Sequence, residues 1–174
     1  MAEAMPLHRT PEQKARERAV LLRSFGGVAV LVLAYSFLPF RGDNWWIGAV
    51  AGVALLASIL PVAVHRLRRV ASSDMPILDA AAALVLLVTL LVVGFASIYY
   101  AMNDKQAQIT GLDSRVDAIY FTVTTLATVG YGDIHPESQW ARVVATVQMM
   151  INIAFIGVAV RIFLRVAQSR DDGD

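Results

Sequence analysis

Four long apolar segments constrain the fold of this chain more than any other feature. They cover residues 19–40, 45–64, 77–101 and 140–164, and each is close to the roughly 20 residues that a helix needs to cross a hydrocarbon core of about 30 Å. The composition agrees, because 57% of the 174 residues are hydrophobic and only 17% are charged. The sequence therefore predicts an all-α membrane protein with four transmembrane helices.

The charge balance and the absence of cysteine exclude several kinds of site. A net charge of only +1 provides no basic surface that could follow a phosphate backbone. The chain has no cysteine, which removes disulfides, thiolate metal sites and a cysteine nucleophile. We therefore expect no nucleic-acid partner, and any chemistry must come from oxygen or nitrogen groups.

Basic residues indicate which side of the membrane each loop occupies. They gather around the start of the first apolar segment, between the second and third, and near the end of the chain: Arg9, Lys14, Arg16, Arg18 and Arg23, then Arg66, Arg68 and Arg69, then Arg161, Arg165 and Arg170. Cytoplasmic loops carry an excess of such residues, so the pattern predicts a multi-pass protein of the cell membrane with both termini in the cytoplasm. A voltage sensor would instead place arginines at every third residue through a span.

About forty residues between the third and fourth apolar segments do not read as an ordinary loop. Residues 103–111 are polar and predict an external turret, after which Asp113 or Ser114 can cap a helix. The helix expected over residues 115–127 is too short to cross the membrane. A chain that enters and returns on one side is tolerated at membrane depth only where it is buried in protein or lines water. We therefore predict a re-entrant helix with a return strand over residues 128–133.

The return strand alternates glycine with larger residues at Val129, Gly130, Tyr131 and Gly132. Glycine readily adopts the left-handed backbone conformation, and alternating handedness can turn successive carbonyls to the same side. A stack of carbonyls, extended by the Thr128 hydroxyl, can replace the water shell of a weakly hydrated cation. Because one strand supplies only one wall, four copies around an axis are required.

The segment TVTTLATVGYGD at residues 122–133, followed by Ile134, His135 and Pro136, resembles the pore signature of the bacterial tetrameric potassium channel family with an ion-channel-2-type pore. The resemblance covers roughly residues 77–165, and two extra transmembrane helices precede it. It implies a homotetramer in the lipid bilayer that conducts potassium passively and selectively.

The resemblance also implies roles for parts of the chain. The oxygens that bind K⁺, the permeant ion, would come from Thr128, Val129, Gly130, Tyr131 and Gly132. Asp133 would support this filter from behind, and the last helix would line the cavity and gate. The chain would divide into a cytoplasmic leader, the first two transmembrane helices, a pore domain and a short cytoplasmic tail: residues 1–18, 19–70, 71–167 and 168–174.

Two positions depart from the family pattern. Thr124 stands where some members have a glutamate that shares a proton with the aspartate after the filter. Asp133 therefore needs another partner, for which the Tyr120 hydroxyl is our candidate, and we group Thr124 and Tyr120 with Asp133 as filter support. Asn152 replaces the hinge glycine of the last helix, which leaves Gly157 as the candidate bend.

Polar residues in and near the last span have two interpretations each. Gln148 and Asn152 lie four apart on one helical face, where they can line a cavity or form interhelical hydrogen bonds. The candidates for the cavity or gate are Asn152, Ile153, Ile156, Gly157 and Val160. His135 either joins a ring of side chains around the outer mouth or points away from the axis in a turn before Pro136.

Other functions fit parts of the sequence. The glycines and aspartate of the filter match the G-x-G-D pattern of intramembrane aspartyl proteases, which need a second carboxylate. Asp79 is expected at the cytoplasmic side and Asp133 outside, so the two carboxylates cannot act together and we expect no enzymatic activity. We also expect no cofactor and no ligand of a soluble domain. A potassium transporter subunit and a non-conducting regulatory subunit stay open as alternatives.

The first two transmembrane segments can pack around the pore pair of their own subunit or over a neighbour. Small residues in them predict close helix packing: Gly26, Gly27, Gly48 and Gly52. Before them, Thr10 can cap a short polar helix whose first residue is Pro11.

Overall fold

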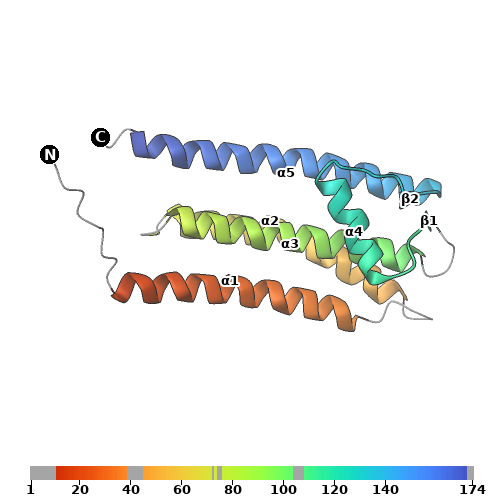
Figure 1. Cartoon of the computed structure of the whole chain (residues 1–174), viewed down its shortest axis with the longest axis horizontal. Helices are drawn as coiled ribbons and strands as arrows, with labels where there is room; N and C mark the ends of the chain where they lie inside the picture. The colour runs from red at the N-terminus through yellow and green to blue at the C-terminus, as the bar shows by residue number, and fades with distance from the viewer. Residues whose placement is uncertain (1–10, 39–44, 72, 74–75, 104–107, 172–174) are drawn as a thin grey trace.

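The chain folds almost entirely into helices (Figure 1). The computed structural model describes residues 11–38, 45–71, 73, 76–103 and 108–171. Its elements are, in chain order, α1 (Pro11–Phe37), α2 (Trp45–Ala71), α3 (Pro76–Asn103), β1 (Ile109–Thr110), α4 (Arg115–Leu126), β2 (His135–Pro136) and α5 (Gln139–Asp171). One short helix thus lies between two long ones where the sequence predicts it.

Three of the described helices are long and apolar enough to cross a membrane. Their spans are Trp46–Val70 in α2, Ile77–Asn103 in α3 and Gln139–Arg161 in α5, which confirms the second, third and fourth predicted segments. Helix α1 begins at Pro11, as expected, and continues for 27 residues. Its described apolar part, Phe25–Phe37, is shorter than a span. The crossing by the first predicted segment therefore stays a prediction, and the threonine expected to cap α1 lies outside the described residues.

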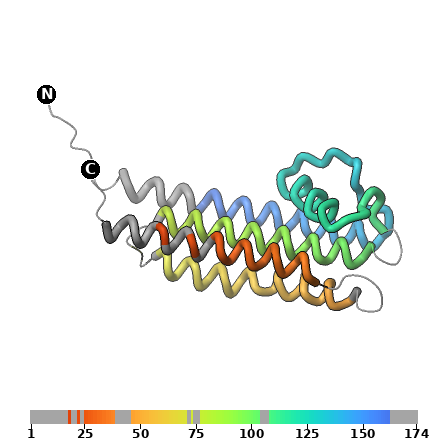
Figure 2. The backbone as a smooth tube through the Cα atoms, turned by 60° about the horizontal axis from the view of Figure 1, so that its bottom comes forward, coloured from red at the N-terminus to blue at the C-terminus, as the bar shows by residue number. Residues whose placement is uncertain are grey.

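Helix α3 is the central helix of the subunit. Half of its apolar window is buried inside the chain, far more than in α2 or α5. Helices α1 and α2 both contact α3 and run beside it (Figure 2), and α4 and α5 contact it as well. The first two helices therefore pack against α3 of their own subunit in this structure.

Glycines allow α2 and α3 to approach closely. A Cβ atom at Gly52 would lie 2.7 Å from the carbonyl oxygen of Gly94, and one at Gly94 would lie 2.7 Å from the Leu56 side chain. The packing role predicted for Gly52 is therefore confirmed. At Gly27 a Cβ would make an ordinary contact of 3.6 Å, and at Gly26 it would meet no described atom within 4 Å. Gly26 makes no close helix contact within the single subunit, so its packing role stays a prediction.

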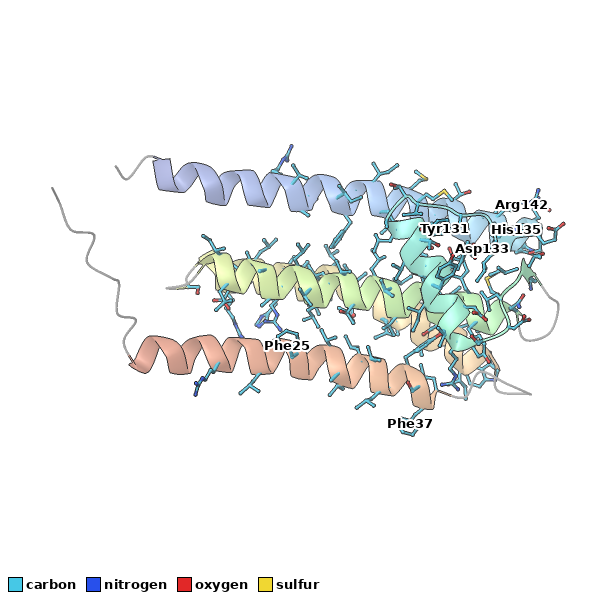
Figure 3. All side chains as sticks on the ribbon, viewed as in Figure 1. Phe25, Phe37, Tyr131, Asp133, His135 and Arg142 are labelled. Atoms are coloured by element: carbon cyan, nitrogen blue, oxygen red, sulfur yellow. The ribbon has the colours of Figure 1, made fainter. Side chains whose placement is uncertain are left out.

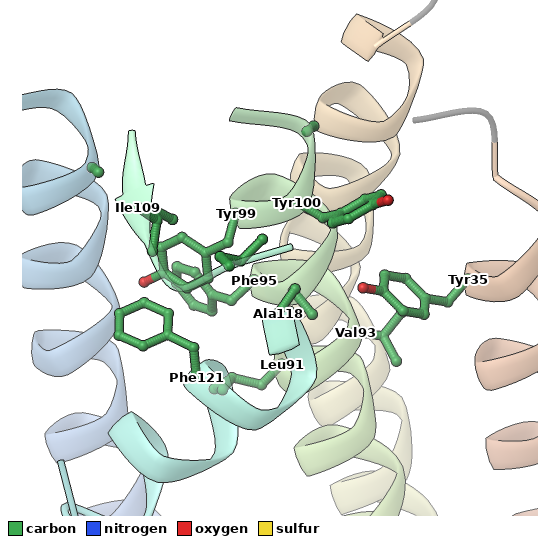
Figure 4. Packing of buried hydrophobic residues seen from close by; sticks show 13 residues of the cluster. Tyr35, Leu91, Val93, Phe95, Tyr99, Tyr100, Ile109, Ala118 and Phe121 are labelled. Carbon is green, nitrogen blue, oxygen red and sulfur yellow. The ribbon is translucent and has the colours of Figure 1, made fainter. Parts of the chain in front are cut away.

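Aromatic side chains hold α4 against α3 (Figure 4). Phe95 and Tyr99 of α3 are stacked with ring centroids 6.1 Å apart, and Phe121 of α4 meets the Tyr99 ring edge-on at 4.9 Å. Ile109 of β1 and Ala118 of α4 are almost fully buried in the same cluster. Aromatic rings bury large areas and prefer such offset and edge-on contacts, so this core attaches the middle of α4 to α3.

Candidate functional site

Helix α4 begins with a capping box. The Ser114 hydroxyl accepts a hydrogen bond from the Asp117 amide at 3.1 Å, and the Asp117 carboxylate accepts one from the Ser114 amide at 2.7 Å. Hydrogen bonding by Ser114 also lowers the pKa of Asp117, so a negative charge is kept beside the positive end of the helix dipole. Ser114 rather than Asp113 is therefore the cap.

We call residues 128–133 the filter segment. Its first residues are hydrogen-bonded to the C-terminal end of α4. The Thr124 carbonyl accepts hydrogen bonds from the amide of Val129 at 2.9 Å and from the amide of Gly130 at 3.4 Å. Carbonyls in the last turn of a helix need such partners. None of the described residues donates a hydrogen bond to the carbonyls of residues 128–131, so these oxygens are available to an ion.

Every second residue of the filter segment has a left-handed backbone. The φ angle is +57° at Thr128, +55° at Gly130 and +83° at Gly132, whereas Val129 and Tyr131 do not have a positive φ. This is the alternation that the glycine spacing predicts, and it can direct successive carbonyls to one side. Thr128 extends the alternation to a residue with a Cβ atom, at a cost of roughly 1–2 kcal/mol. Backbone strain of this kind clusters at functional sites.

The filter segment lies open on the surface of the single subunit (Figure 3). The side chains of Val129 and Tyr131 are 51% and 72% exposed. The Tyr131 ring is stacked on Tyr120 of α4, with centroids 6.4 Å apart and the ring planes only 4° from parallel.

Asp133 has the partner expected for it. The Tyr120 hydroxyl donates a hydrogen bond to Asp133 Oδ2 at 2.9 Å, and this bond raises the pKa of Tyr120, so the phenol stays protonated as a donor. The Thr124 hydroxyl instead donates to the Phe121 carbonyl at 3.1 Å, within α4. Thr124 therefore contacts the filter segment through its backbone carbonyl and not through its side chain.

Strands β1 and β2 tie the connection between α3 and α4 to the end of the filter segment. They pair antiparallel, with Ile109 opposite Pro136 and Thr110 opposite His135. Gly111 follows β1 with a φ of +79°, and a Cβ atom there would lie 2.8 Å from the Asp133 carbonyl oxygen. Only glycine permits this approach.

His135 lies beside the end of the filter segment (Figure 3). Its Nδ1 donates a hydrogen bond to the Gly132 carbonyl at 3.1 Å, since a carbonyl can only accept. Its Nε2 is 3.7 Å from the Glu137 carboxylate, and both side chains are exposed. A ring of such side chains around a mouth requires further copies of the chain and stays a prediction.

One face of α5 packs inside the subunit and carries two polar side chains. The face consists of residues at helical spacing: Ala141, Ala145, Gln148 and Asn152. Gln148 Nε2 donates to the Thr122 carbonyl of α4 at 3.1 Å, and its Oε1 accepts from the Tyr99 hydroxyl of α3 at 2.5 Å. Of the two roles left open for Gln148, the structure shows interhelical hydrogen bonding.

Asn152 does not line a cavity. Its side chain is only 2% exposed in the single subunit, and association with further copies can only bury it more. Its Nδ2 donates to the Thr125 carbonyl at 3.4 Å, while its Oδ1 is buried without a hydrogen-bond partner among the described residues. The prediction that grouped Asn152 with the cavity or gate is therefore wrong, because the face of α5 that carries it is turned to α4.

The other candidates for the cavity or gate lie on the exposed part of α5. The side chains of Ile153, Ile156 and Val160 are exposed in the single subunit, and a Cβ atom at Gly157 would meet no described atom within 4 Å. Helix α5 continues unbroken through Gly157. The roles of these four residues stay predictions.

The two carboxylates that a protease would bring together are apart. Asp79 lies in the first turn of α3 and accepts a hydrogen bond from Ser73, whereas Asp133 contacts Tyr120 of α4. Within the described part of the chain, no cluster of three or more His, Asp or Glu could hold a metal ion.

Two contacts that position α4 could not be predicted from spacing. Tyr99 donates to Gln148 from another helix, and Arg115 donates to backbone carbonyls of α1. In the sequence, Arg115 appears only as a charged residue at the start of a short helix between two apolar segments. A solvent-exposed arginine would look the same, so the sequence does not reveal this contact.

Comparison with known proteins relates the second half of the chain to channels. Residues 87–169 match the family described as ion channel. The chain is 38% identical over 72 residues to two pore potassium channel b of Oryza sativa subsp. japonica. It is 34% identical over 68 residues to the calcium-gated potassium channel TvoK of Thermoplasma volcanium, and 39% identical over 64 residues to the potassium channel protein kcv of Paramecium bursaria Chlorella virus 1.

The likeness covers only part of each chain. The three alignments include 41%, 39% and 36% of this chain, and 20%, 20% and 61% of the respective relatives. The matched region thus spans about a fifth of the rice and Thermoplasma proteins. The comparison with solved structures found no significant match to the chain.

Proposed function

We propose that this chain is one subunit of a potassium-selective channel that conducts K⁺ passively, with residues 128–133 as its selectivity filter. The observation that carries the proposal is the left-handed backbone at Thr128, Gly130 and Gly132, in a segment whose first four carbonyls receive no hydrogen bond from the described residues. Such a backbone can present a column of oxygens that replaces the hydration shell of K⁺. The match to the ion channel family and the likeness to proteins named potassium channels support the same function.

The proposed channel is a homotetramer in a lipid bilayer. One filter segment forms one wall, and the exposed Val129 and Tyr131 leave apolar surface for further copies to cover. Four copies around an axis would surround K⁺ with the carbonyl oxygens of the filter and the Thr128 hydroxyl. The ion-binding residues in this arrangement are Thr128, Val129, Gly130, Tyr131 and Gly132.

The proposed topology has four transmembrane helices, α1, α2, α3 and α5, with α4 re-entrant and both termini cytoplasmic. The arginines in the last turn of α2, Arg68 and Arg69, fit the cytoplasmic side. The C-terminal end of α4 would then point into the membrane, where its dipole, about half an elementary charge, favours a cation. Asp133 and His135 would lie at the outer end of the filter.

The remaining residues divide between support and gate. Tyr120 and the Thr124 carbonyl hold the filter segment at its two ends. The exposed residues of α5 that would line the cavity or gate are Ile153, Ile156 and Val160. A helix without a proline bends most readily at a glycine, so Gly157 is the proposed bend.

Flux through the purified protein tests the proposed function. After reconstitution into liposomes we expect a potassium flux that far exceeds the sodium flux, and a reversal potential that follows the potassium gradient, because the carbonyl oxygens suit the less tightly hydrated ion. Cross-linking should give a tetramer as the largest species. Uphill uptake coupled to another ion would favour the transporter alternative, and an assembled protein without any flux would favour a regulatory subunit.

Replacing Tyr120 by phenylalanine should make the filter less durable. The substitution keeps the ring that is stacked on Tyr131 and removes only the hydrogen bond to Asp133. We expect potassium current that decays several-fold faster during sustained conduction than in the wild type. Thr124→Val is the matched control, since it removes a hydroxyl that bonds only within α4. Equal decay in both variants would contradict the role assigned to the Tyr120–Asp133 bond.

A further inference from the structure

Arg115, the first residue of α4, donates hydrogen bonds to backbone carbonyls at the C-terminal end of α1. Its Nη1 donates to the carbonyl of Tyr35 at 2.8 Å and also to the carbonyl of Ser36, and its Nη2 donates to the carbonyl of Leu38 at 2.8 Å. The Tyr35 hydroxyl returns a hydrogen bond to the Arg115 carbonyl at 3.0 Å. The guanidinium carbon lies 5.9 Å from the centre of the Tyr100 ring of α3. Three helices therefore meet at this one side chain.

The chemistry of both partners suits this contact. The last carbonyls of a helix have no partner within the helix, and they carry the negative end of its dipole. A guanidinium presents several donors in a fixed planar fork and is always charged. The fork can therefore satisfy several of these carbonyls at once, which a single-point cation such as lysine cannot do.

Helix α1 packs along α3, and its buried side chain lies at the contact with Arg115. Tyr35 is the one buried side chain among those described in α1, and its ring reaches from α1 towards Ala118 of α4 and Tyr100 of α3 (Figure 4). Helix α2 is attached differently, since its close contact is with α3 at Gly52 and does not involve Arg115. The end of α1 is thus fastened to the beginning of α4 by a reciprocal exchange of hydrogen bonds.

We infer that Arg115 is a positioning residue through which α1 sets the place of α4, and through α4 the geometry of the filter. The inference rests on the proposed channel function. Helix α4 has 12 residues, so it is a stiff rod of roughly 18 Å. Its first residue is held by α1, and its Thr124 carbonyl holds the amides of Val129 and Gly130. A shift of α4 at the α1 end is therefore carried to the filter, and because coupling between two sites is reciprocal, a change in the filter is carried to α1.

The first test keeps the charge and removes the fork. In Arg115→Lys, we expect the sodium-to-potassium permeability ratio to rise by up to roughly tenfold, which corresponds to about 1.4 kcal/mol at the filter. Hydrogen exchange at the amides of Val129 and Gly130 should also become faster, a readout that does not depend on conduction. Arg18→Lys is the matched control, since Arg18 is an exposed residue of α1 away from this contact.

The second test removes one oxygen atom from the other side of the contact. Tyr35→Phe deletes the hydroxyl that donates to the Arg115 carbonyl and should raise the permeability ratio in the same direction by a smaller factor. Its control is Ser36→Ala, which deletes a hydroxyl that bonds only to the Val32 carbonyl within α1. If Arg115→Lys does not assemble, Tyr35→Phe decides the question.

The outcomes separate the inference from the function on which it rests. A wild-type protein that fails to select potassium overturns the proposed function. A selective wild type, with Arg115→Lys and Tyr35→Phe that melt at lower temperature but keep the wild-type permeability ratio and the wild-type exchange at Val129 and Gly130, overturns the inference alone. In that case the contact would stabilise the subunit without positioning the filter.

Discussion

Replacing Gly130 by alanine should abolish potassium-selective conduction and leave the subunit folded. Gly130 has a φ of +55°, a conformation that costs an L-residue roughly 1–2 kcal/mol, and the cost recurs in every copy around the axis. An alanine relieves it by rotating toward negative φ, which turns the adjoining carbonyl away from its neighbours. A Cβ atom at Gly130 would meet no described atom within 4 Å, so the loss comes from the backbone and not from a clash.

The matched control for this substitution is Gly26→Ala. Gly26 lies inside α1, and a Cβ atom there also meets no described atom within 4 Å. In a helix interior alanine is favoured over glycine by about 0.5–1 kcal/mol, so this variant should conduct like the wild type and melt no earlier. Reversal potentials in mixed potassium and sodium solutions compare the two variants. Wild-type selectivity in Gly130→Ala would place the filter elsewhere in the chain.

Replacing Gln148 by leucine should impair assembly of the channel more than any surface change on α5. The substitution leaves the fully buried Tyr99 hydroxyl without its acceptor and removes a donor from the Thr122 carbonyl. A buried polar group that loses its partner costs about 1–3 kcal/mol, and each subunit bears this cost. We expect a lower melting temperature of the assembled protein and a smaller tetramer fraction by native mass spectrometry.

A double variant distinguishes the lost hydrogen bond from a packing defect. Adding Tyr99→Phe to Gln148→Leu removes the stranded hydroxyl, and replacing both partners of a bond by apolar groups is often nearly neutral. The double variant should therefore recover much of the lost stability. The matched control is Gln139→Leu, the same substitution at an exposed position of α5. A double variant less stable than Gln148→Leu would mean that the Tyr99–Gln148 bond is not the source of the effect.

The sequence by itself determined the features that depend on neighbouring residues. The length of the apolar runs predicted α2, α3 and α5, because a membrane crossing needs a fixed number of helical residues. The glycines at 130 and 132 predicted the alternating backbone, because few other residues adopt a positive φ. A cap at Asp113 or Ser114 and the short stretch after it predicted the start and the length of α4, and the structure decided for Ser114.

Local signals also predicted one contact across the chain. Thr124 stands where some members of the family that the sequence resembles have a glutamate partner for the aspartate, and Tyr120 was the candidate named in its place; the structure shows that hydrogen bond. The positive φ of Thr128 was not predicted, because threonine has no intrinsic preference for that conformation and the hydrogen bonds of the filter segment to α4 impose it.

Only the tertiary structure decided which way the polar faces of the helices turn. Spacing placed Gln148 and Asn152 on one face of α5 but could not tell a face toward water from a face toward α4. The hydrogen bonds between Arg115 and α1 join residues about eighty positions apart in the sequence. No local sequence pattern predicts a contact over such a separation. Helical periodicity fixes the angle between side chains on one helix, whereas the direction that a face takes in space is set by how α3, α4 and α5 cross and pack together.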